Sequence, residues 1–375
     1  MPDLTHYTGR EQGYIKHALI EKYLERFVIK IGSGWDEIIY LDAFAGPWGA
    51  KSEDLSDTSF GIALNLLKRG CQTVAQIRKR SPKIRVILIE KDPHAFAKLN
   101  QFFKTQPPPG IEITCLEGAF EDQAHTLAEY TKGNSFLFSL IDPKGWAGLS
   151  MQVIAPLVKK RPSEVLVNVM TSFIYRFSDL EQCSDSYDAF FGRPEVREII
   201  TRTPVAERQD AVVREYCRSL RELCGFKYVS SCVVLQPDKK GIKYFMVFAT
   251  NNPMGIKVFK EAEAHAASLQ DELKYANEFG DQTPLFSCDS MEPVSMELRQ
   301  KYRSLAFKRV EEHFSDKSVA TYEEVFCKAM AMPLVTENEL VDFLKFHPNL
   351  KLILDGKKRK KPDINKGDRV IKTIT

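Results

Sequence analysis

The chain has 375 residues, of which 43% are hydrophobic and 27% are charged, as in a soluble globular protein. Its net charge of +3 is too small to indicate nucleic-acid binding by itself, and no apolar run is long enough to span a membrane. The first ten residues lack the basic and then apolar pattern of a secretory signal, so we expect a cytoplasmic protein. The eight cysteines form no Cys-x-x-Cys pair, and we expect reduced thiols and no metal site.

A helix is predicted over residues 11–29, and the first strand follows it. Lys16 and His17 lie at the start of this helix, where they fit a solvated face. Residues 38–41 form a short apolar run typical of a strand buried on both faces, which ends at Asp42. The turn after it contains Phe44 and Gly46, and such turns let the backbone approach a nucleotide. A plain strand and turn would explain this stretch equally well.

The next two predicted strands, residues 84–89 and 111–116, also end in acidic turns. A carboxylate after the second strand can accept hydrogen bonds from both hydroxyls of a ribose. A carboxylate in an acidic turn after the third strand can accept a hydrogen bond from the exocyclic amine of an adenine. The residues at these two ends are Glu90 and Lys91, then Glu121 and Asp122.

The fourth strand, residues 135–141, is the most apolar and ends in the sequence DPKGW, residues 142–146. An Asp-Pro pair after a strand is often an ordinary turn. As the fourth consecutive strand end with a carboxylate, it favours a functional site. The candidate residues here are Asp142, Pro143, Lys144 and Trp146.

The second half of the chain completes the sheet and adds a C-terminal part. Residues 164–170 predict a fifth strand, 178–224 a helical insertion, and 227–235 with 242–249 an antiparallel hairpin. The fold class is therefore α/β, with a mostly parallel sheet closed by an antiparallel hairpin. Helices over 296–314, 321–329 and 336–346 and two strands around a lysine-rich loop indicate a winged helix. That basic wing could bind RNA or DNA, or be a solvated loop.

Four segments, residues 40–47, 90–93, 142–146 and 245–255, resemble the bacterial three-Cys-motif partner proteins, a family similar to class I S-adenosylmethionine (SAM) dependent methyltransferases. The resemblance covers nearly the whole chain. It implies a Rossmann-like methyltransferase domain over residues 1–275 and a three-Cys-motif protein as partner. The order of the C-terminal elements predicts a winged-helix-like basic domain over residues 290–375. A more distant resemblance to the adenine-amine methyltransferase of large-subunit ribosomal RNA implies that Lys16 and His17 face the cofactor pocket.

The methyltransferase motifs are matched in part. The pattern Asp-x-Phe-x-Gly is that of motif I, although Trp48 stands where the family has its next glycine. Asp142 and Pro143 match the Asp-Pro-Pro-aromatic motif of amino-group methyltransferases, whereas Lys144 and Gly145 depart from it.

The resemblance implies SAM as cofactor and an amino group of a base or nucleotide-like substrate as acceptor. Asp42 would then lie near the methionine ammonium, Asp142 would orient the acceptor amine and help it lose a proton, and Trp146 or Phe173 would stack on the substrate. Lys159–Arg161 and the wing would hold phosphates. The alternative is an inactive methyltransferase-fold module that binds the three-Cys-motif partner.

Overall fold

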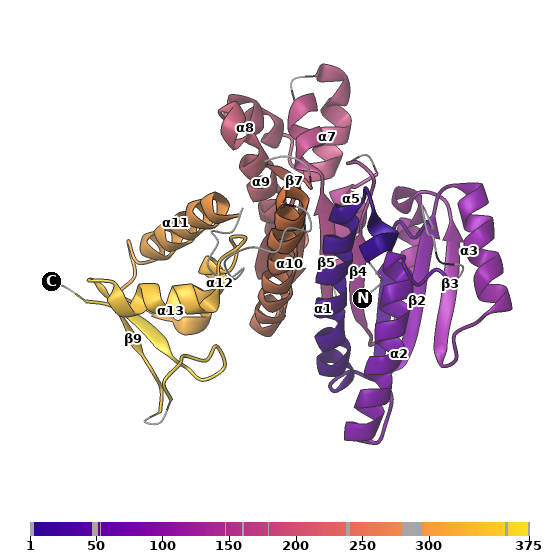
Figure 1. Cartoon of the computed structure of the whole chain (residues 1–375), viewed down its shortest axis with the longest axis horizontal. Coiled ribbons are helices and arrows are strands. Elements are labelled where there is room, and N and C mark those ends of the chain that lie inside the picture. The colour runs from indigo at the N-terminus through magenta and orange to yellow at the C-terminus, as the bar shows by residue number, and fades with distance from the viewer. Residues whose placement is uncertain are drawn as a thin grey trace.

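The computed structural model describes residues 4–46, 52, 54–146, 148–159, 161–178, 180–237, 241–279, 295–356 and 359–373. A seven-stranded sheet with the strand order β3-β2-β1-β4-β5-β7-β6 forms its centre (Figure 1). The strands are β1 (Glu37–Asp42), β2 (Lys83–Glu90), β3 (Ile111–Glu117), β4 (Phe136–Ile141), β5 (Ser163–Val169), β6 (Tyr228–Leu235) and β7 (Ile242–Thr250).

The sheet is parallel except at one edge. β1 pairs in parallel with β2 and β4, and β7 runs antiparallel to both β5 and β6. This order, with its antiparallel last hairpin, is that of a Rossmann-like class I methyltransferase sheet, and the sequence prediction of this sheet is confirmed. The central strands β1, β4 and β5 are almost fully buried, because helices cover both faces of the sheet.

Helices form one layer on each side. On one side α1 (Glu11–Gly32) packs between α2 (Ser59–Arg78) and α10 (Pro253–Phe279) (Figure 1). Phe60 of α2 contacts Phe103 of α3 (Pro93–Thr105), which extends this layer. The other layer contains α4 (Ala124–Tyr130), α5 (Met151–Val158) and α9 (Arg208–Glu222), as right-handed crossovers require. None of the described helices is long and apolar enough to cross a membrane.

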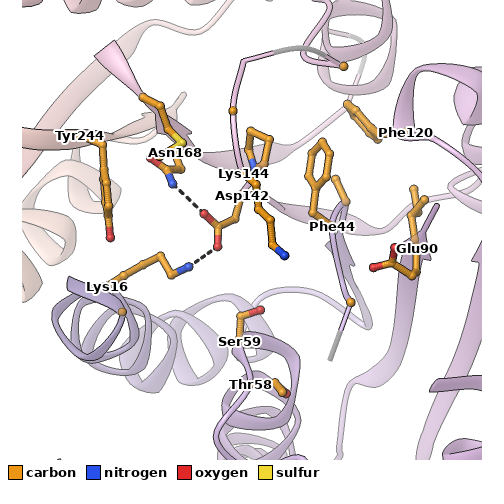
Figure 2. A pocket seen from close by; sticks show the side chains of 18 of the residues that line it. Lys16, Phe44, Thr58, Ser59, Glu90, Phe120, Asp142, Lys144, Asn168 and Tyr244 are labelled. Atoms are coloured by element: carbon orange, nitrogen blue, oxygen red, sulfur yellow. Dashed lines mark hydrogen bonds and ion pairs between the residues drawn. The ribbon is translucent and has the colours of Figure 1, made fainter. Parts of the chain in front are cut away.

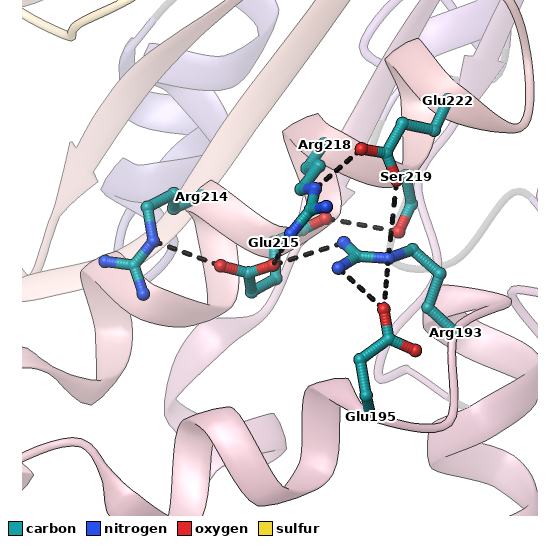
Figure 3. A network of polar contacts seen from close by, with 7 residues as sticks. All are labelled: Arg193, Glu195, Arg214, Glu215, Arg218, Ser219 and Glu222. Atoms are coloured by element: carbon teal, nitrogen blue, oxygen red, sulfur yellow. Dashed lines mark hydrogen bonds and ion pairs between the residues drawn. The ribbon is translucent and has the colours of Figure 1, made fainter.

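The insertion is helical, as predicted, and is held by aromatic and charged contacts. It contains α7 (Ser184–Phe191), α8 (Val196–Arg202) and α9. Arg193 and Glu215 form a buried ion pair at 3.1 Å, and Glu195 accepts a second hydrogen bond from Arg193 at 2.9 Å (Figure 3). Removing one member of such a buried pair leaves an uncompensated charge, so the pair fixes how the helices of the insertion pack.

A C-terminal unit, defined here as residues 295–373, contains three helices and three strands. The two threonine-capped helices predicted from the sequence are present: Thr321 and Thr336 each form a capping box at the helix N-terminus. The short strand β8 was missed, because three residues are too few for a recognisable alternation. The elements are α11 (Met296–His313), β8 (Val319–Thr321), α12 (Tyr322–Ala329), α13 (Glu337–Phe346), β9 (Leu350–Ile353) and β10 (Arg369–Lys372), with the strand order β8-β10-β9.

The C-terminal unit is bonded to α10 and β6. Lys260 donates to the carbonyl of Met332 at 2.9 Å and pairs with Glu263, which accepts from the backbone N–H of Leu334 at 2.8 Å. On β6, the hydroxyl of Ser230 donates to the carbonyl of Met330 at 2.6 Å. These bonds are buried, so the C-terminal unit packs against the edge strand β6 and the neighbouring helix α10 (Figure 1).

Candidate active site

A cavity of about 800 Å³ opens at the carboxyl ends of β1, β2 and β4. This volume lies within the range of pockets that bind small molecules and cofactors. The position is the one expected for an open α/β sheet, in which ligands bind where the strand order reverses, here between β1 and β4. Of the predicted site residues, those that line the cavity are Lys16, His17, Phe44, Gly46, Glu90, Lys91, Glu121, Asp142, Pro143, Lys144 and Trp146.

Asp142 is held by two side chains from distant parts of the chain (Figure 2). One carboxylate oxygen accepts the Lys16 ammonium, and the other accepts the amide N–H of Asn168 at 2.9 Å. Burial opposes ionisation of this carboxyl group, but the Lys16 charge and both hydrogen bonds outweigh it and hold the pKa of Asp142 below its ordinary value. Asp142 is therefore ionised, and a carboxylate with a lowered pKa is a weak base. Of the two roles expected for it, the lowered pKa favours orienting a hydrogen-bond donor over helping that donor to lose a proton.

His17 is buried on α1 and neutral. Its Nδ1 atom is 2.7 Å from the hydroxyl of Tyr7, which precedes α1. Burial, and then the neighbouring Lys16 charge, lower the pKa of His17 to about 3. The imidazole therefore contributes shape and one hydrogen bond to the cavity, and no charge at neutral pH.

Asp42 lies beneath the cavity and not in its wall, which differs from the expected position near a ligand ammonium. It is fully buried, and accepts hydrogen bonds from the backbone N–H of Phe44 at 3.1 Å and the hydroxyl of Ser59 at 2.9 Å. Burial raises the pKa of Asp42 to about 7, against these two bonds. Asp42 thus fixes the turn after β1 and the N-terminus of α2, where Thr58 and Ser59 line the cavity (Figure 2).

The far end of the cavity carries Glu90 at the end of β2 and Glu121 in the turn after β3. Glu90 is buried at the end of β2 and accepts the backbone N–H of Asp92 at 2.7 Å. Glu121 lies against Gly148: a Cβ atom on this glycine would be 2.9 Å from the carboxylate. Glycine at 148, where φ is +85°, therefore makes room for Glu121. Asp122 is exposed and does not line the cavity.

Aromatic rings close two sides of the cavity. Phe120 is buried, with its ring centroid 6.1 Å from that of Phe44, and it also lines the cavity. Trp146 packs edge-to-face on Tyr187 of the insertion at 5.3 Å. Phe173, the other predicted stacking residue, is 40% exposed and is not part of the cavity wall.

Several lining residues were not identified from the sequence. Asn168 interrupts the apolar run of β5, and that single polar residue near a strand end was the only signal available. Others come from the segment before α1 and from the start of β7, which the antiparallel pairing with β5 brings to the same edge. Among them are Tyr7, Arg10, Lys243 and Tyr244.

The predicted phosphate contacts outside the cavity are placed less favourably. Arg161 donates a hydrogen bond to the carbonyl of Thr131. Lys160 lies outside the described residues, and so do Pro47 and Trp48 of the first turn and two lysines of the predicted wing. In the described part of the predicted wing, Arg359 is paired with Asp368. The described residues contain no group of His, Cys, Asp or Glu side chains that could hold a metal ion.

Comparison with known proteins gives remote structural similarities. No family model and no curated protein matches the sequence. Among solved structures, human methyltransferase-like protein 13 in complex with SAH is 12% identical, with a TM-score of 0.33 over 76% of this chain and 98% of that one. An O-methyltransferase from Bacillus cereus in complex with SAH is 14% identical, with a TM-score of 0.32 over 61% of this chain and 80% of that one. An rRNA methylase from Streptococcus thermophilus is 11% identical, with a TM-score of 0.29 over 60% of this chain and 92% of that one. The fold assignment above rests on the strand order of this chain.

Proposed function

We propose that the protein is a SAM-dependent methyltransferase that acts on an amino group of a nucleic-acid base or nucleotide-like substrate. The observation that carries this proposal is the arrangement of one cavity at the strand ends. Glu90 lies on one side of it and Asp142 on the other, with Phe44 and Lys144 between them (Figure 2). A pocket of this form has a place for a nucleoside at the acidic end and a place for an acceptor beside Asp142.

The acidic end fits the nucleoside part of SAM. Glu90 would accept hydrogen bonds from the ribose hydroxyls, and Glu121 would accept the adenine amine while Phe120 packs beside the ring. Gly46 and Phe44 would lie along the methionine part. The bound cofactor supplies a methyl group on an already activated sulfonium, so the main task of the protein is to position the two reactants.

The other end fits an acceptor amine. Asp142 would accept a hydrogen bond from the amine and orient its lone pair toward the methyl group, with Lys16 and Asn168 holding the carboxylate in place. Trp146 and Pro143 would contact the ring that carries the amine. A base in a duplex would have to be flipped out to reach this position.

The experiment that tests this proposal is calorimetric titration with SAM and its demethylated product SAH, followed by transfer assays on total RNA, DNA and nucleotides. Asp142→Ala is expected to reduce methyl transfer by about 10²-fold or more and to leave the affinity for SAH nearly unchanged. Loss of both would place Asp142 in the cofactor site and contradict its assigned role.

A second candidate function is a binding module without catalysis, which docks a three-Cys-motif protein. The observation that favours it is that both carboxylate oxygens of Asp142 already have partners in Lys16 and Asn168. Absence of binding to both SAM and SAH would support this candidate over the enzyme.

We further propose that residues 290–375 form a winged-helix-like domain. The order α11-β8-α12-α13-β9-β10 and the antiparallel sheet support this assignment. The helix that would enter a nucleic-acid groove, α13, carries Glu337, Glu339 and Asp342 against the single cation Lys345. That charge favours the partner protein over RNA or DNA as the ligand of this domain.

A further inference from the structure

The two ends of the cavity differ in charge. At the ends of β2 and β3 the ionisable side chains are two carboxylates and one lysine, namely Glu90, Glu121 and Lys91. The opposite end is formed by the segment before α1, the start of α1, the loop after β4 and the start of β7, together with Asp57 just before α2. We call this end the substrate half. Its cations are Arg10, Lys16, Lys144 and Lys243, and its carboxylates are Asp57 and Asp142.

Four cations and two carboxylates give the substrate half an excess of positive charge. The ion pair with Lys16 neutralises Asp142. Asp57 is largely buried and accepts the backbone N–H of Ser52 at 3.4 Å. His17 adds no charge, and Lys144 reaches into the cavity beside Asp142 (Figure 2). Low-dielectric walls strengthen the field of such a cluster, which attracts anions.

The cations of the substrate half alternate with aromatic rings that the fold holds in place. The guanidinium of Arg10 lies 5.9 Å from the ring centroid of Tyr7 and donates to the carbonyl of His6 at 2.9 Å. Tyr244 follows Lys243 on β7, and its hydroxyl donates to the carbonyl of Gln12 at 2.9 Å. Cations interleaved with aromatic rings suit a ligand that is both flat and anionic.

We propose that the substrate half binds a phosphate attached to the methyl acceptor, with Arg10 and Lys243 as its main contacts. The substrate is then a nucleotide unit, free or within a polynucleotide, and not a free base, a nucleoside or a neutral small molecule. A guanidinium presents five N–H donors in a planar fork that matches phosphate oxygens, and a lysine ammonium adds a point charge. This inference rests on the proposed function for the position of the acceptor ring at Asp142.

The test is calorimetric titration of the full chain, with and without saturating SAH. The probes are the four ribonucleoside 5′-monophosphates, the matching nucleosides, inorganic phosphate as a competitor, and a single-stranded RNA of about ten nucleotides. The variants are Arg10→Gln and Lys243→Gln, and the matched control is Lys22→Gln, which removes a cation from the exposed face of α1. SAH titration of each variant reports whether the rest of the cavity is intact.

At least one monophosphate or the RNA is expected to bind about tenfold or more tightly than the matching nucleoside. Arg10→Gln and Lys243→Gln should each remove most of that difference, and Lys22→Gln should not. Preference for the RNA identifies a polynucleotide substrate, and equal binding of a monophosphate identifies a free nucleotide. Equal affinity for nucleotides and nucleosides, no binding of any phosphate probe, or unchanged binding in both variants would overturn the phosphate site. Failure of SAH alone to bind would instead contradict the methyltransferase, because the phosphate dependence is also measured without SAH.

Discussion

Replacing Lys16 by methionine should destabilise the protein because it leaves Asp142 buried without its cation. The two side chains are 17% and 13% exposed. Removing one partner of a buried ion pair costs about 3–5 kcal/mol, and a hydrogen bond to a charged group contributes about 1.5–3 kcal/mol. Asn168 still donates to Asp142 in the variant. We therefore expect a loss of about 2–4 kcal/mol in the free energy of unfolding at neutral pH.

The loss should depend on pH in a defined direction. In the wild type the pKa of Asp142 is lowered, so its contribution is present above the ordinary carboxyl pKa and is lost only as the pH falls through the lowered value. Without Lys16, burial acts with less opposition and the pKa rises, so the group destabilises the variant increasingly as the pH rises. Chemical unfolding monitored by circular dichroism at about pH 5 and about pH 8 should show the larger loss at the higher pH.

A matched control separates this effect from loss of a lysine on α1. Lys22 lies on the same helix and forms an ion pair with Glu25. The side chain of Lys22 is 41% exposed and that of Glu25 is 48% exposed. Lys22→Met should change stability by only a few tenths of a kcal/mol. If Lys16→Met matched Lys22→Met, or lost the same stability at both pH values, the buried ion pair described above would be refuted.

Three other predictions concern buried groups and the cofactor end. Burial raises the pKa of Glu164 from 4.5 to about 7, so the stability that this carboxyl group contributes is complete below its ordinary pKa and is lost as the pH rises through 7. Glu164→Gln should therefore remove about 2.5 kcal/mol from the fall in unfolding free energy between about pH 5 and about pH 8. Gly70→Ala should lower the free energy of unfolding by about 1–3 kcal/mol, because its Cβ would be 2.4 Å from Val28, whereas Gly13→Ala meets only ordinary contacts and should be tolerated. Glu90→Ala should weaken SAH binding about tenfold or more by calorimetry, and unchanged affinity would exclude Glu90 from the cofactor site.

The sheet could be predicted from the sequence because its signals are local. Each strand is an apolar run bounded by glycine, proline or charged residues, and the parallel order follows from the helices between the runs. The predicted strand ends at Asp42 and Ile141 agree with the structure. The short strand β8 and the contacts of the C-terminal unit with α10 could not be predicted, because both depend on long-range packing.

The cavity was less predictable than the fold, since its walls come from distant segments. Sequence position placed Asp42 and Asp142 at equivalent strand ends, yet one is buried under the turn and the other lies in the cavity wall. The difference arises from neighbours that no local pattern reveals: Ser59 covers Asp42, whereas Lys16 and Asn168 hold Asp142. Lys243 reaches the site only because β7 runs antiparallel to β5.

The way in which the C-terminal unit is seated also matters for any effort to make a smaller protein. In a chain shortened after residue 279, Lys260 would lose its hydrogen bond to the carbonyl of Met332, and Glu263 would lose its bond from the N–H of Leu334. The truncation would also expose to solvent a face of α10 that is now buried. Such a fragment would expose apolar surface to solvent and would tend to aggregate. Deletion of residues 295–373 is therefore a poor route to a smaller stable protein, whatever that unit binds.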